Sequence, residues 1–214
     1  MSNTMQRIIV GFVMVLIAVL AAVGEYFGIP AVKYLSMLIV LGMIIELTIC
    51  LCCAPKDILK KNIWLFATFF AWLIVMFVAA AYVGTRPWIM LLLLLIISCA
   101  DIGAWFFGKM IGGDKMWERL SAHKTWSGQI GGIICGTIAS IMYGLLGADV
   151  FMPQLMWIGI GISLLSQYGD LTASWIKRKL GLKDFSRILP GHGGLLDRFD
   201  GWIYALPLIW LIML

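Results

Sequence analysis

Long apolar runs alternate with short polar segments along almost the whole chain. Seven runs of about 20 residues can be distinguished, a length that crosses a hydrocarbon core of ~30 Å as an α-helix. They cover residues 8–23, 31–54, 63–83, 88–107, 129–148, 153–176 and 199–214. The pattern predicts an all-α polytopic membrane protein, built as a bundle of about seven transmembrane helices.

The first apolar run follows a single basic residue, Arg7, as the apolar core of a signal peptide would. No clear A-x-A cleavage site follows it, so we interpret it as a membrane span. The polar residues are concentrated in three segments, 55–62, 108–128 and 177–198. No linker, repeat or low-complexity tract divides the chain, which predicts a single integral membrane domain over residues 1–214.

Composition agrees with this interpretation and excludes an ordinary soluble domain. Hydrophobic residues make up 62% of the sequence and charged residues 13%, whereas apolar residues make up roughly half of a soluble domain. The mean hydropathy is +0.99.

The basic residues are distributed very unevenly between the two sides that seven spans would define. One side carries Lys33 and Arg86. The other side carries the remaining fourteen: Arg7, Lys56, Lys60, Lys61, Lys109, Lys115, Arg119, Lys124, Lys177, Arg178, Lys179, Lys183, Arg187 and Arg198. Because basic loops stay on the cytoplasmic side, we expect the N-terminus and all three polar segments to lie in the cytoplasm.

Four acidic residues fall inside the predicted spans or at their edge: Glu46, Asp101, Asp170 and Asp200. Ionisable side chains are costly within a bilayer, so each is a candidate functional residue. In the predicted orientation all four lie in the cytoplasmic half of their helices. Their convergence at one level indicates a site near the cytoplasmic surface.

The sixth predicted span ends in a polar stripe. Asp170, Ser174 and Lys177 follow one another at helical spacing, which places them on one face that leads to the cytoplasmic surface. Such a stripe is also compatible with a helix-stabilising pair that faces neighbouring helices. The polar segment that follows favours the functional interpretation.

This segment contains the stretch LPGHGGLLDRFD at residues 189–200. Its glycines allow main-chain N–H groups to approach a ligand, as in many phosphate-binding loops. Asp197 and Asp200 share a face at the start of the last span and offer the hard oxygen ligands that Mg²⁺ takes beside substrate phosphates. Together with nearby bases, these features predict a metal-bridged phosphate site at the membrane surface.

The bases before the stretch have a simpler explanation as well. They can serve as a positive-inside anchor around a Pro/Gly turn, and Lys179 and Arg187 need no further role. His192 has three open roles, since it could bind a phosphate oxygen, ligate a metal or cap the turn.

The residues 174–200, SWIKRKLGLKDFSRILPGHGGLLDRFD, resemble the C-terminal signature of the phosphatidate cytidylyltransferase (CDP-diacylglycerol synthase) family. The signature is S-x-x-K-R-x(4)-K-D-x(5)-P-G-H-G-G-x-x-D-R-x-D, and every fixed position is present. GDL at 169–171, ADIGAWFFGK at 100–109 and SAHKTWSG at 121–128 are similar to further family segments.

Some positions depart from the family pattern. The segment S-P-K-K-T-W-E-G has Ala122, His123 and Ser127 at three positions here, and Ala173 stands where a Glu often precedes the serine. Residues 100–214 are therefore expected to supply the catalytic spans and cytoplasmic loops, and residues 1–99 the N-terminal spans.

The resemblance implies the reaction CTP + phosphatidate → CDP-diacylglycerol + pyrophosphate at the cytoplasmic face of the cell's inner (plasma) membrane. It implies Mg²⁺ as cofactor and leaves room for a second cation. The expected partners are CTP, phosphatidate and membrane lipid, with no nucleic acid, and a homodimer is left open.

Residue by residue, the match gives a set of candidate site residues. For metal binding we expect Asp197 first, then Asp170 and Asp200, and for phosphate contacts Lys177, Arg178, Arg198 and Lys124. Asp170, Lys177, Asp197, Arg198 and Asp200 form the expected catalytic set. The other expected substrate-binding residues are Thr125, Ser174, Lys183, Asp184, His192, Gly193 and Gly194.

Two alternatives remain. A CTP-dependent polyprenol kinase would use a similar nucleotide site but transfer the γ-phosphoryl group, and the complete signature argues against it. A cation or proton transporter would also keep acids in the membrane, but it needs no glycine-rich loop with bases beside it and would place its acids near the midplane.

Overall fold

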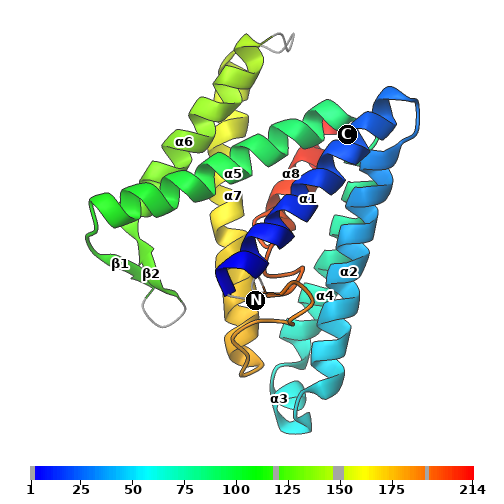
Figure 1. The fold of residues 1–214 in the computed structure, drawn as a ribbon. Coiled ribbons are helices and arrows are strands. Elements are labelled where there is room, and N and C mark those ends of the chain that lie inside the picture. Colours follow the sequence, from blue (N-terminus) through cyan, green and yellow to red (C-terminus); the bar gives the residue numbers. More distant parts are fainter. Residues whose placement is uncertain (1–2, 118–120, 147–151, 191–192) are drawn as a thin grey trace.

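The computed structural model describes residues 3–117, 121–146, 152–190 and 193–214 (Figure 1). Over these parts the chain forms eight helices and one antiparallel pair of strands. The helices are α1 (Asn3–Tyr26), α2 (Ala31–Cys53), α3 (Lys56–Lys61), α4 (Ile63–Val83), α5 (Pro87–Met110), α6 (Trp126–Leu145), α7 (Met152–Lys179) and α8 (Trp202–Met213). The strands are β1 (Lys115–Trp117) and β2 (Ser121–Thr125).

The prediction of a helical membrane protein is confirmed, but a count of seven spans is not. Within the described residues five helices, α1, α2, α4, α5 and α6, are long and apolar enough to cross a bilayer. Helix α7 has 28 residues but carries the polar stripe along its second half. Helix α8 has 12 residues, which corresponds to about 18 Å, less than a hydrocarbon core.

The last helix begins later than the apolar run predicts. Residues 199–201 form a turn before the helix, since the Trp202 N–H donates to Phe199 O and the Ile203 N–H donates to Asp200 O, each three residues back. Asp200 is therefore part of the loop before α8. This placement determines where its carboxylate can reach.

The polar segment between α5 and α6 contains a short hairpin that the sequence pattern does not reveal. Strands β1 and β2 pair in antiparallel fashion, and the Trp126 N–H donates to Asp114 O at 3.2 Å where the hairpin meets α6. Thr125 is the N-cap of α6, and its side chain accepts a hydrogen bond from the Gly128 N–H.

Helices α5 and α6 approach each other closely through glycines. A Cβ atom at Gly103 would lie 2.7 Å from the Cβ and Sγ atoms of Cys135. Small residues at a helix interface let backbones pack closely where no water drives association. Helix α7 packs against α6, and α5 crosses both of these helices (Figure 1).

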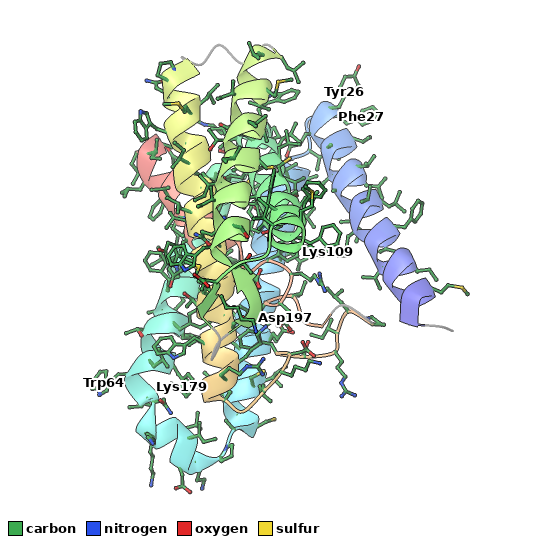
Figure 2. All side chains as sticks on the ribbon, turned by 90° about the vertical axis from the view of Figure 1, so that its left-hand side faces the viewer. Tyr26, Phe27, Trp64, Lys109, Lys179 and Asp197 are labelled. Atoms are coloured by element: carbon green, nitrogen blue, oxygen red, sulfur yellow. The ribbon has the colours of Figure 1, made fainter. Side chains whose placement is uncertain are left out.

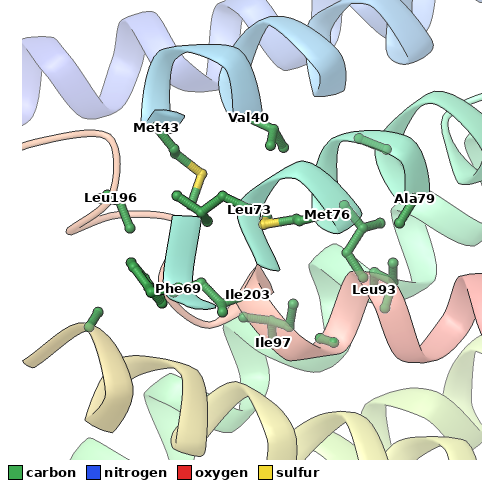
Figure 3. Close-up of a cluster of buried hydrophobic side chains, with 14 of the residues drawn as sticks. Val40, Met43, Phe69, Leu73, Met76, Ala79, Leu93, Ile97, Leu196 and Ile203 are labelled. Carbon is green, nitrogen blue, oxygen red and sulfur yellow. The ribbon is translucent and has the colours of Figure 1, made fainter. Parts of the chain in front are cut away.

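The apolar core lies mainly between α2, α4 and α8. Met43, Leu73 and Ile203 are fully buried there, one from each helix (Figure 3). Leu196, from the loop between α7 and α8, is also fully buried and lies beside Met43 and Phe69. The loop is thus packed into the same core as the helices.

The described polar segments lie toward one end of the bundle. Figure 1 shows α3 and the loop that follows α7 at the end opposite to the α1–α2 turn. Lys33 and Gly84 lie close together near that turn, because a Cβ at Gly84 would be 2.7 Å from the Lys33 Cα. The basic residues of α3 and of the loop are therefore separated from Lys33 by the length of the helices.

Candidate active site

The loop between α7 and α8 is organised around the carboxylate of Asp197. Its Oδ1 forms an ion pair with Lys177 Nζ at 2.6 Å, and the two side chains are 7% and 13% exposed. Its Oδ2 accepts hydrogen bonds from the Phe185 N–H at 2.9 Å and from the Gly194 N–H at 3.0 Å. One buried carboxylate therefore ties α7 to two distant parts of the loop.

The same loop is attached to α2 by Glu46, which is 1% exposed. Glu46 Oε2 accepts from the Leu196 N–H at 2.7 Å, and Oε1 accepts from the Ser186 hydroxyl. Nearby on α2, the Cys50 thiol donates to Phe185 O at 3.0 Å. Glu46 is one of the acids that the sequence places within a predicted span, and its partners come from a loop far along the chain.

Two glycines in the loop are required by its geometry. Gly193 has φ 86°, a conformation that other residues rarely adopt, and its carbonyl accepts from the Leu189 N–H at 2.9 Å. Gly194 lies directly against Glu46, so that a Cβ atom there would collide with the carboxylate. The loop's own conformation and packing thus explain both glycines, and their expected contact with substrate stays a prediction.

A pocket of about 420 Å³ lies beside this loop, between α5, α6, α7 and the turn before α8. Its walls combine polar and aromatic groups. The lining residues are Asp101, Ala104, Trp105, Lys124, Thr125, Gly128, Gln129, Gln167, Asp170, Asp197 and Asp200. Five of the sequence-predicted site residues, Lys124, Thr125, Asp170, Asp197 and Asp200, are thus brought to one cavity.

Asp170 is the centre of the polar contacts in this pocket. Its Oδ2 forms an ion pair with Lys124 Nζ at 2.5 Å, and its Oδ1 accepts from the Ser174 hydroxyl at 3.4 Å. Lys124 is carried by β2, and its Nζ also donates to Gln167 O at 3.4 Å. The hairpin therefore places the Lys124 ammonium group beside the Asp170 carboxylate on α7. The hydrogen bond between Ser174 and Asp170 confirms that these two residues share a helix face.

The lining is strongly acidic, with four carboxylates and the single ammonium group of Lys124. A triphosphate would be repelled by such a pocket unless cations neutralised it. The hard oxygen donors of Asp101, Asp170 and Asp200 are the ligand type that Mg²⁺ prefers. Among the described residues, however, no three acidic, His or Cys side chains stand close enough together to form a ready metal cluster.

The structure places the other predicted residues around this pocket rather than in its wall. Lys177 lies behind Asp197, and Lys183, Asp184 and Arg198 are exposed on the loop between α7 and α8. His192 lies outside the described residues.

Arg178 is separated from the other predicted phosphate-binding residues. It lines a second pocket on another side of α7, and its guanidinium donates to Leu182 O at 3.3 Å. Because Arg178 directly follows Lys177 on α7, its side chain leaves the helix about 100° further around, away from Asp197.

The model of the cytidylyltransferase family matches residues 1–214, which is the whole chain. The chain belongs to the cytidylyltransferase family.

Several proteins named phosphatidate cytidylyltransferase are similar in sequence to this family member. The protein of Staphylococcus aureus (strain COL) is 44% identical over 124 residues, which cover 56% of this chain and 46% of the relative. That of Staphylococcus saprophyticus is 40% identical over 121 residues, with 56% and 46% covered. That of Brucella suis biovar 1 is 43% identical over 120 residues, with 54% and 43% covered. The chain spans about half the length of the curated relatives that it matches.

Asp101 and Gln167 line the pocket but were not among the expected site residues. Asp101 was noted as an intramembrane acid without a role, and Gln167 was not singled out. Gln167 Nε2 donates to Gln129 O at 3.2 Å and so joins α7 to α6 at the pocket wall. The spacing of Gln167 before Asp170, on the polar side of α7, was the available signal.

We predict that Glu46→Gln loosens the loop without unfolding the protein. The substitution removes one of two accepted hydrogen bonds and the charge that strengthens the other, a loss of about 1–3 kcal/mol. Hydrogen exchange measured by mass spectrometry should become about tenfold faster or more at the amides of 185 and 193–197.

Glu25→Gln is the matched control, because Glu25 Oε1 also accepts a main-chain hydrogen bond, from the Val32 N–H at 2.9 Å, near the opposite end of the bundle. It should leave exchange in the loop unchanged. Equal exchange in wild type and Glu46→Gln would show that Glu46 does not hold the loop.

Proposed function

We propose that the protein transfers the cytidylyl group of CTP to phosphatidate, yielding CDP-diacylglycerol and pyrophosphate. The observation that carries the proposal is the acidic pocket beside the glycine-rich loop. Family membership and the names of the relatives support it. A cytosolic nucleotide and a membrane-embedded lipid would both reach such a pocket.

In this reaction an oxygen of the lipid phosphate attacks the α-phosphorus of CTP. A new P–O bond forms, the bond between the α-phosphorus and the α,β-bridging oxygen breaks, and pyrophosphate leaves with that electron pair. The lipid phosphate is already ionised at neutral pH, so no side chain has to remove a proton from it. Positioning and charge neutralisation are therefore the main tasks of the protein.

Lys124 is the residue of the pocket wall best placed to neutralise a phosphate oxygen. Its ammonium group is paired with Asp170 at 2.5 Å, and a phosphate could compete for it as an alternative anion. Asp170 and Asp200 would hold Mg²⁺, which would supply positive charge to the triphosphate, and Asp101 adds a further carboxylate to the pocket wall. A second cation would suit the excess of carboxylates.

We assign Asp197 mainly to holding the loop, because both of its oxygens are already engaged by Lys177 and two main-chain N–H groups. Lys177 fixes Asp197 and adds positive charge behind the wall. Arg198 and Lys183, which are exposed near the loop, and His192 remain proposed contacts for the triphosphate.

We further propose that the active site faces the cytoplasm and that the protein resides in the cell's inner membrane. The proposal is supported by the concentration of basic residues at the end of the bundle that carries α3 and the loop. CTP is a cytosolic substrate, so this orientation also supplies the nucleotide.

The chemistry predicts which phosphorus of CTP reaches the lipid. With purified protein, phosphatidate and Mg²⁺, α-labelled CTP should leave its label in a chloroform-soluble product, and γ-labelled CTP should release its label as pyrophosphate. A lipid kinase would place the γ-label in the lipid and leave the α-label in CDP. Appearance of γ-label in the lipid would overturn the proposal even if every pocket residue were essential.

Asp170→Asn should lower kcat for cytidylyl transfer by on the order of 100-fold or more, because it removes a charge from the proposed metal site with almost no change in volume. The thermal unfolding temperature should stay near that of wild type. Asp114→Asn, an exposed acid beside the hairpin, is the control and should retain wild-type kcat. Similar losses in both variants would contradict the assignment.

Orientation can be measured by cysteine labelling in a cysteine-free background. Lys183→Cys should react with a membrane-impermeant maleimide in inverted vesicles, and Thr85→Cys in right-side-out cells, because both positions are exposed at opposite ends of the bundle. The reverse pattern would place the active site outside the cell.

A further inference from the structure

A second pocket of about 330 Å³ lies between α3 and the end of α7, apart from the acidic cavity. Its lining is basic and partly apolar. The lining residues are Asp57, Ile58, Lys61, Asn62, Arg178 and Lys179. The two pockets have no lining residue in common.

The charge of the second pocket is opposite to that of the first. Lys61, Arg178 and Lys179 provide three cations against the carboxylate of Asp57. Arg178 is partly oriented by its bond to Leu182 O, which leaves the rest of its planar fork for an anion. A guanidinium with two ammonium groups beside it is suited to a phosphate group.

The position of the pocket indicates where this phosphate would come from. Trp64, two residues past Asn62, is 82% exposed, and neighbouring Ile63 is 54% exposed. Figure 2 shows Trp64 and Lys179 at the same end of the molecule. Exposed tryptophans at helix ends mark the headgroup level of a bilayer, so the pocket opens at the depth of lipid phosphates, and Ile58 supplies an apolar wall.

We propose that this basic pocket binds the headgroup phosphate of an anionic phospholipid, at a site separate from the catalytic pocket. The lipid would join α3 to the end of α7, the helix that also carries Asp170 and Lys177. Arg178, the one predicted phosphate-binding residue found on another side of α7, thereby receives a role of its own.

The test uses the full-length protein in detergent and short-chain phosphatidylglycerol as the probe, with phosphatidylcholine as the neutral comparison. Native mass spectrometry gives the apparent affinity for each lipid. The variant Lys61→Gln/Lys179→Gln removes two cations of the pocket. Each basic residue at a membrane surface contributes about fivefold to the binding of anionic lipid, so we expect a roughly 30-fold weaker affinity for phosphatidylglycerol.

The matched control is Lys56→Gln/Lys60→Gln, which removes the same charge from exposed positions of α3 that do not line the pocket. It should bind phosphatidylglycerol as wild type does. Equal losses in the two variants would show diffuse attraction to basic residues and overturn the site, as would an unchanged affinity in Lys61→Gln/Lys179→Gln.

Inorganic phosphate provides the third arm. If it displaces phosphatidylglycerol at equal concentration, the pocket recognises free phosphate and the lipid assignment is wrong. We expect no displacement under these conditions, because the apolar wall contributes to lipid binding. The readout is lipid binding and not turnover, so failure here is distinct from failure of the proposed cytidylyl transfer.

Discussion

The buried ion pair between Lys177 and Asp197 is the contact on which the geometry of the site depends. Both side chains are almost withdrawn from solvent, where removing one partner of a pair typically costs about 3–5 kcal/mol because the other charge is left uncompensated. Asp197 also receives two main-chain N–H groups of the loop. The pair therefore fixes the path of the chain into the turn at Asp200, and with it the position of that carboxylate beside Asp170.

The N-terminal helices contribute to the site without entering the pocket. Glu46 on α2 receives a main-chain N–H and a hydroxyl of the loop, and Leu196 is buried in the core between α2 and α4. Helices α2 and α4, which carry no family-like motif, thus pack against the glycine-rich loop between α7 and α8 and hold it in position. These hydrogen bonds explain why Glu46 is present within a membrane helix although it does not line the acidic pocket.

Five of the expected site residues line one pocket, and they could be selected from the sequence because helical periodicity and a long signature act locally. The shared face of Asp170 and Ser174 follows from a period of 3.6 residues, and the loop glycines follow from the motif. The partner of Glu46 could not be found this way, since it lies 150 positions along the chain. Arg178 lines a different pocket, which the motif could not reveal because it specifies residue types and not side-chain directions. Eight residues after Asp170, Arg178 lies about 80° away around the helix.

A double-mutant cycle on Lys177→Met and Asp197→Asn tests directly whether the buried ion pair between these two side chains holds the loop in place. The free energy of unfolding in a denaturing detergent titration should fall by about 3 kcal/mol in each single variant. In the double variant it should fall by at least about 2 kcal/mol less than the sum, because no unpaired buried charge remains. Strictly additive losses would show that the two side chains act independently, and the loop would then owe its position to other contacts.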